Sequence, residues 1–128
     1  MPTELKLLIW SVALTFVLML VSVAGATAQV GLPMLLGNRE GMPKLTGWAG
    51  RSLRAHYNMV ENMALFAPLV VVGHLTGRNN ATTVAGAEIF FFARLAYAFV
   101  YVIGIPYLRT LIWTASVIGL ILIFSQLI

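Results

Sequence analysis

Long apolar runs alternate with short polar stretches along this chain, and the pattern predicts the fold. Four runs are each close to or longer than the roughly 20 apolar residues that a helix needs to cross a bilayer. The sequence therefore predicts an all-α integral membrane protein, a four-helix bundle in a single domain that covers residues 1–128. The expected helices span about residues 5–29, 50–76, 81–103 and 107–127.

The first apolar run has a competing interpretation as a secretory signal peptide. Residues 24–28 (Ala-Gly-Ala-Thr-Ala) resemble a small-residue cleavage site. The run is longer than the hydrophobic region of a signal peptide, and only a thin basic segment precedes it. We therefore expect a retained first helix.

Two local patterns refine this picture. Residues 31–50 are rich in glycine and proline, which end helices and prevent new ones, so we expect a long connection without helix there. A loop of this length in a compact chain is either functional or mobile. The third helix opens with the small-residue pairs Thr82/Gly86 and Thr83/Ala87, which predict close helix packing.

Composition agrees with a membrane protein and argues against other classes. The 128 residues are 60% hydrophobic and only 9% charged, against about 25% charged in soluble domains. The net charge of +4 comes from scattered basic residues, with no run that could follow a nucleic-acid backbone. The chain has no cysteine, no aspartate and two histidines, so we expect no metal site and no nucleic-acid partner.

Ionisable side chains inside a membrane segment are costly, so their positions indicate a site. Two polar stripes follow helical spacings of three and four residues. The stripe on the second helix consists of Arg51, Arg54, Asn58 and Glu61, and the stripe on the third consists of Arg94, Tyr97 and Tyr101. The positive-inside rule puts the first and third connections in the cytoplasm and both termini outside. Both stripes and Arg109 then converge at the cytoplasmic interface.

The convergent residues suit an anionic ligand that carries carboxylates and an amine. Arg54 could hold a carboxylate in a two-bond fork, Glu61 could accept from an ammonium, and Asn58 could do both. Arg109 could stabilise a ligand thiolate. The alternative is structural: Glu61 and Arg94 could pair across helices, and tyrosines often anchor membrane proteins. The spacing alone leaves both interpretations open.

Two motifs resemble those of a known family. Arg54-Ala-His-Tyr-Asn58-Met-Val-Glu61 resembles the Arg-Ala-x-x-Asn-x-x-Glu signature of the MAPEG family, the membrane-associated proteins of eicosanoid and glutathione metabolism. The stretch from Arg94 to Tyr101 resembles the helix-three motif of that family, and residues 106–109 resemble its third loop. The resemblance covers essentially the whole chain and is to a bacterial-type member.

The resemblance implies a homotrimer of four-helix bundles in the cell membrane, with sites between subunits. It implies glutathione as the cofactor, a hydrophobic small molecule or lipid as the acceptor, and Arg109 as the catalytic thiol activator. It further implies a set of glutathione-binding residues: Arg54, His56, Asn58, Glu61, Arg94, Tyr97 and Tyr101.

Two other functions remain open at this stage. The first is a non-catalytic lipid-binding protein or an accessory subunit of a larger membrane complex that keeps the same fold. The second is a small transporter or channel. The second is less favoured because only His74 and Glu88 suggest a polar path through the membrane.

Overall fold

The computed structural model describes all residues from Met1 to Ile128 and contains helices and turns but no strands. Four helices are long and apolar enough to cross a membrane, which confirms the predicted all-α fold with four long apolar helices. The fifth, α2, is a single short helix in the first connection. The elements are α1 (Thr3–Val30), α2 (Leu32–Leu36), α3 (Gly47–Leu75), α4 (Ala81–Ile103) and α5 (Pro106–Leu127).

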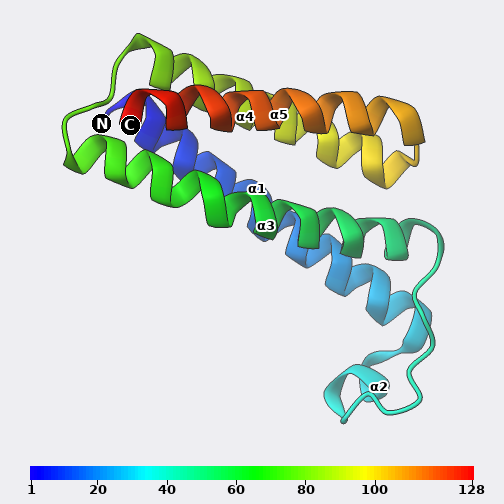
Figure 1. The fold of residues 1–128 in the computed structure, drawn as a ribbon. Helices are drawn as coiled ribbons and strands as arrows, with labels where there is room; N and C mark the ends of the chain where they lie inside the picture. The colour runs from blue at the N-terminus through cyan, green and yellow to red at the C-terminus, as the bar shows by residue number, and fades with distance from the viewer.

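The long helices form two antiparallel pairs, α1 with α3 and α4 with α5 (Figure 1). Between the pairs, α4 packs on both α1 and α3, whereas α5 contacts α3 but not α1. Both termini and the turn between α3 and α4 lie at one end of the bundle, and α2 lies at the other (Figure 1). The turn between α4 and α5 lies at the same end as the start of α3 (Figure 1).

The predicted absence of helix from residues 31–50 is wrong, because α2 forms within this segment and α3 already begins at Gly47. Gly31, at a φ of 83°, ends α1 in a conformation that other residues rarely adopt. Pro33 then lies in the first turn of α2, where a missing backbone N–H costs nothing. The glycine and proline therefore separate two helices instead of preventing the second one.

Large apolar side chains cover the outside of the bundle. Phe16, Phe99 and Ile121 are 57%, 65% and 58% exposed, respectively. Exposed apolar area of this extent is unfavourable in water and is compatible with lipid. The interior combines Phe66 and Phe90, whose stacked rings lie 4.0 Å apart between centroids, with small residues that let the helices approach closely.

Helices α4 and α5 are in close backbone contact at Gly86 and Gly119. A Cβ atom added at Gly119 would lie 2.6 Å from the carbonyl oxygen of Gly86 and 2.9 Å from the amide nitrogen of Phe90. A Cβ atom added at Gly86 would lie 2.7 Å from the carbonyl oxygen of Gly119. Only glycine fits at either position, so the predicted close packing at the start of this helix is confirmed at Gly86.

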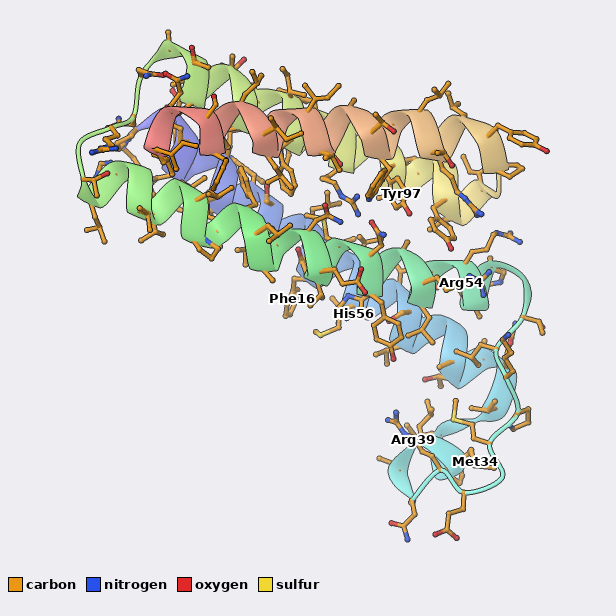
Figure 2. All side chains as sticks on the ribbon, viewed as in Figure 1. Phe16, Met34, Arg39, Arg54, His56 and Tyr97 are labelled. Carbon is orange, nitrogen blue, oxygen red and sulfur yellow. The ribbon has the colours of Figure 1, made fainter.

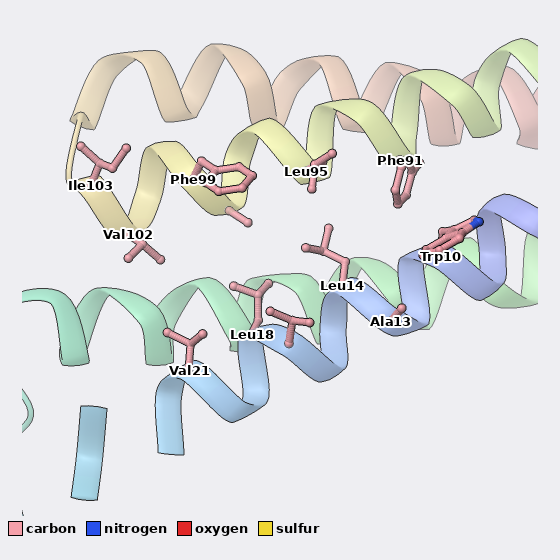
Figure 3. Close-up of a pocket in the computed structure, with 12 residues that line it drawn as sticks. Trp10, Ala13, Leu14, Leu18, Val21, Phe91, Leu95, Phe99, Val102 and Ile103 are labelled. Atoms are coloured by element: carbon pink, nitrogen blue, oxygen red, sulfur yellow. The ribbon is translucent and has the colours of Figure 1, made fainter. Parts of the chain in front are cut away.

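A groove remains between α1 and α4, with a volume of about 420 Å³. Phe91, Leu95 and Phe99 of α4 face Leu14 and Leu18 of α1 across it (Figure 3). Every side chain that lines this groove is hydrophobic. Because a specific ligand site also needs polar groups that orient the ligand, the candidate site lies elsewhere.

We expect Gly119→Ala to lower the melting temperature of the detergent-purified protein, because the new methyl group would overlap backbone atoms of α4. Overpacking of this kind costs about 1–3 kcal/mol. Gly37→Ala is the matched control, since a Cβ there would meet its nearest neighbour at 3.6 Å, an ordinary contact. Equal melting temperatures for the two variants would contradict the proposed packing constraint.

Candidate functional site

The predicted polar side chains come from three helices that meet near the turn between α4 and α5. By helix, they are Arg54, Asn58 and Glu61 on α3, Arg94, Tyr97 and Tyr101 on α4, and Arg109 on α5. The turn itself consists of only Gly104 and Ile105, and Gly104 has a left-handed φ of 96°. This short turn brings the first turn of α5 beside the last turns of α4.

Tyr101 lies at the centre of the site and contacts two arginines. The Nε atom of Arg54 donates a hydrogen bond to the Tyr101 hydroxyl, at 3.2 Å. The guanidinium of Arg109 lies over the Tyr101 ring, 4.6 Å from its centroid. Cation–π contacts at this distance are attractive, so one phenol holds a residue from α3 and one from α5 against α4.

Tyr97 extends this arrangement one turn deeper into the bundle. Its ring packs edge-on against the ring of Tyr101, with the centroids 5.4 Å apart. On its other side the guanidinium of Arg94 lies 4.2 Å from the Tyr97 centroid. The result is a continuous row in which the two tyrosine rings lie in the middle, with a guanidinium group at each end. The order is Arg94, Tyr97, Tyr101 and Arg109.

Arg94 is a buried cation without a carboxylate partner. Its side chain is 1% exposed, and its Nε atom donates only to the sulfur of Met59, at 3.4 Å. Both of its terminal Nη atoms are buried without a hydrogen-bond acceptor. The pairing of Glu61 with Arg94 that the spacing allowed is therefore not formed within the chain. A buried charge without a counter-charge costs stability, so packing alone does not account for Arg94.

A small polar cleft of about 200 Å³ opens beside this row. It is lined by Asn58, Tyr97, Arg109, Thr110 and Trp113. A larger groove of about 710 Å³ between α3 and α5 shares Asn58 and Trp113 with the cleft and is otherwise mainly apolar. The polar cleft therefore continues into the mainly apolar groove between α3 and α5.

Asn58 and Glu61 present free polar groups to this space. Asn62 donates from Nδ2 to the backbone oxygen of Asn58 at 2.8 Å and to its side-chain oxygen at 3.2 Å. The side-chain nitrogen of Asn58 thus remains able to donate to a ligand. Glu61 is exposed and lines the larger groove.

His56 is the predicted site residue that the structure places apart from the others. It lines a separate hollow of about 240 Å³ between α1 and α3, together with Phe16 and Val60. In Figure 2, His56 and Phe16 lie on the side of α3 that faces away from α4 and α5. The buried Nδ1 atom of His56 has no hydrogen-bond partner. Within one chain, His56 does not reach the other site residues.

Sequence reasoning did not find the contact that Arg51 makes, nor two of the cleft residues of α5, Thr110 and Trp113. The Nε atom of Arg51 donates to the carbonyl oxygen of Val102 at 2.9 Å, in the last turn of α4, and so links the start of α3 to the end of α4. The spacing of three residues put Arg51 on the same stripe as Arg54, but it did not indicate a backbone partner on α4. Trp113 follows Arg109 by four residues, and the same helical spacing would have placed it on the same face.

Comparison with known proteins identifies one family. A family model described as the MAPEG family matches residues 7–128, nearly the whole chain. Comparisons with curated proteins and with solved structures gave no match.

The unpaired burial of Arg94 leads to a stability prediction. Arg94→Met keeps a long side chain and removes the buried charge, so we expect the melting temperature to stay equal or rise. Phe90→Ala is the sensitivity control, because loss of a fully buried phenyl ring costs about 3–5 kcal/mol. Destabilisation by Arg94→Met as large as that of Phe90→Ala would mean that Arg94 is a structural residue.

Proposed function

This chain belongs to the MAPEG family, and from that premise we propose that it is a glutathione-dependent membrane transferase or peroxidase. Its acceptor would be a hydrophobic electrophile or a lipid hydroperoxide. The observation that carries the proposal is the row of guanidinium and phenol groups beside a cleft that opens into an apolar groove. A charged thiol cofactor and an apolar acceptor need two adjoining environments of this kind.

The residues around the cleft match the polar groups of glutathione. The tripeptide carries two carboxylates and one ammonium. Arg54 uses only its Nε atom within the chain, so its terminal nitrogens are free to bind a carboxylate. Glu61 is exposed and would accept from the ammonium, and the free amide nitrogen of Asn58 would donate to a second acidic or amide oxygen. Tyr97 and Tyr101 would add contacts from α4.

Arg109 is the group that we propose activates the thiol. It lines the polar cleft, which shares Asn58 and Trp113 with the apolar groove. A cation beside a thiol lowers the thiol pKa below its usual value of about 8.5 and so raises the fraction of thiolate near neutral pH. The thiolate is the nucleophile. With a hydrophobic electrophile it would form a carbon–sulfur bond while the acceptor releases its leaving group as an anion. With a lipid hydroperoxide it would attack the terminal oxygen, break the O–O bond and release the lipid alcohol; a second glutathione would then reduce the resulting sulfenic acid to the disulfide and water.

The groove between α3 and α5 is the proposed acceptor site. It adjoins the polar cleft at Asn58 and Trp113, and its walls include Leu65, Leu69 and Phe124. The groove between α1 and α4 is less suitable because it contains no polar residue and shares none with the cleft. An acceptor there would lie away from the thiol.

We further propose that the active unit is a homotrimer with its sites between subunits. The polar cleft of about 200 Å³ is smaller than the roughly 300–1,000 Å³ of most small-molecule sites, so a tripeptide would extend outward past Arg54 and Glu61. A neighbouring subunit would close this open side. His56, on the opposite face of α3, would then join the site of a neighbour.

The distribution of basic residues favours a topology with loops one and three in the cytoplasm.

The second candidate is a lipid-binding or accessory membrane subunit without catalysis, alone or in a larger complex. The observation that favours it is the purely apolar groove between α1 and α4, which suits an acyl chain. In that case the arginine and tyrosine row would hold the helices together, and glutathione would not bind at millimolar concentration.

We expect Arg54→Ala to weaken glutathione binding tenfold or more. Loss of hydrogen bonds to a charged group costs about 1.5–3 kcal/mol. Isothermal titration calorimetry and thermal shift on the detergent-purified protein would measure the change. Arg78→Ala is the matched control, since Arg78 is exposed at the opposite end of the bundle and donates to the carbonyl oxygen of Leu127. Unchanged affinity in Arg54→Ala would remove Arg54 from the site.

Arg109→Ala should separate activation of the thiol from binding. We expect glutathione affinity to change little and the ultraviolet absorbance of bound thiolate at neutral pH to fall. Thr110→Ala, a neighbouring change in the same cleft that keeps the charge, should retain the absorbance. Persistence of the thiolate signal in Arg109→Ala would assign activation to another group.

A further inference from the structure

A second candidate site is a hollow where α1, α2, the first connection and α3 meet. The hollow there has a volume of about 370 Å³ and is lined mostly by hydrophobic side chains, including Val23, Leu35 and Leu36. Arg39 is the only charged residue in its lining. The hollow shares no residue with the polar cleft or with the groove between α3 and α5.

Arg39 is held in position by its backbone and by one hydrogen bond. It is the only residue other than glycine with a positive φ, at 62°. Its Nε atom donates to the carbonyl oxygen of Leu35, at 3.1 Å. The terminal Nη groups make no hydrogen bond within the chain and remain free to bind an anion. In Figure 2, Arg39 extends from the connection into the space between α2 and α3.

The walls of the hollow are fixed by contacts at the base of the connection. The side-chain amide of Gln29 donates to the carbonyl oxygen of Thr46 at 2.6 Å and accepts from its amide nitrogen at 3.0 Å. Ala26, Leu45 and Ala49 form a small separate core beside this bridge. The segment that carries α2 and Arg39 is therefore attached to both α1 and α3.

The exposed surface of α2 indicates the surroundings of the hollow. Leu32 and Leu36 are 53% and 77% exposed, and the exposed charged residues Arg39, Glu40 and Lys44 follow α2 along the chain. Exposed apolar side chains beside a segment of net positive charge are typical of the boundary between acyl chains and headgroups. A ligand that enters from this boundary has an apolar part and a headgroup.

We propose that this hollow binds one anionic phospholipid. The phosphate accepts hydrogen bonds from the free guanidinium nitrogens of Arg39, and the upper part of an acyl chain lies over Leu35 and Leu36 toward Val23. Charge selects the lipid, because Arg39 has no acidic partner in the hollow and anionic headgroups are attracted to basic residues at the membrane surface. A zwitterionic lipid brings its own cation to the site and gains less from Arg39.

The test compares lipid binding by the wild-type protein and four variants in mixed micelles. Phosphatidylglycerol and phosphatidylcholine are the two probes, measured by thermal shift and by native mass spectrometry of retained lipid. Arg39→Gln removes the charge, and Arg39→Lys keeps it. Lys44→Gln makes the same charge change in the same connection at an exposed residue that does not line the hollow.

We expect the wild type to retain phosphatidylglycerol in preference to phosphatidylcholine. Arg39→Gln should lower this preference about fivefold, as loss of one basic residue near an anionic surface predicts. Lys44→Gln should change the preference less than twofold, which corresponds to about half of the free energy of one such basic residue or less. Arg39→Lys should keep part of the preference that Arg39→Gln loses. Val23→Trp, which fills the hollow and keeps Arg39, should reduce retention of both lipids.

Three results would overturn the proposal. Equal effects of Arg39→Gln and Lys44→Gln on the lipid preference would show that general surface charge, and not a specific site, selects the lipid. Equal retention of both lipids by the wild type would show apolar contact without headgroup recognition. A changed oligomer mass in Arg39→Gln with unchanged lipid retention would make this face a contact between copies of the chain. Each measurement is independent of glutathione binding.

Discussion

The direct backbone contact between Gly86 and Gly119 controls how the second half of the bundle is assembled. Helices this close must keep one relative position along their axes, since any added side-chain atom would overlap backbone. The short turn at Gly104 then leaves little freedom at the other end of the same pair. Together these constraints bring Arg109 over the ring of Tyr101, which is the central contact of the candidate site.

The site has an excess of positive charge that the chain itself does not neutralise. Arg54 and Arg94 donate hydrogen bonds to a phenol and a thioether, and Arg109 faces an aromatic ring. Aromatic faces stabilise cations without removing their ability to bind an anion. The arrangement therefore leaves the guanidinium groups of Arg54 and Arg109 accessible, as the proposed binding of an anionic cofactor requires.

The two faces of α3 serve different surroundings. One face carries Arg54, Asn58 and Glu61 toward α4 and α5, and the opposite face carries His56 and Tyr57 toward hollows that α1 borders. Within one chain, the hollow proposed to bind phospholipid shares no lining residue with the cleft and groove proposed to bind glutathione and its acceptor.

The sequence by itself determined the number and type of the long helices, because apolar run length and helical spacing are local properties. The spacings of three and four residues also put the predicted polar side chains on shared helix faces, and the structure brings most of them together near the turn between α4 and α5. The sequence did not determine α2, because Gly31 and Pro33 are compatible with both a helix boundary and an irregular loop. Nor did it decide between an ion pair and an unpaired Arg94. Only the packing of α4 against α3 buried that guanidinium beside Met59 and away from any carboxylate, since partner choice depends on distances between helices that spacing within one helix does not specify.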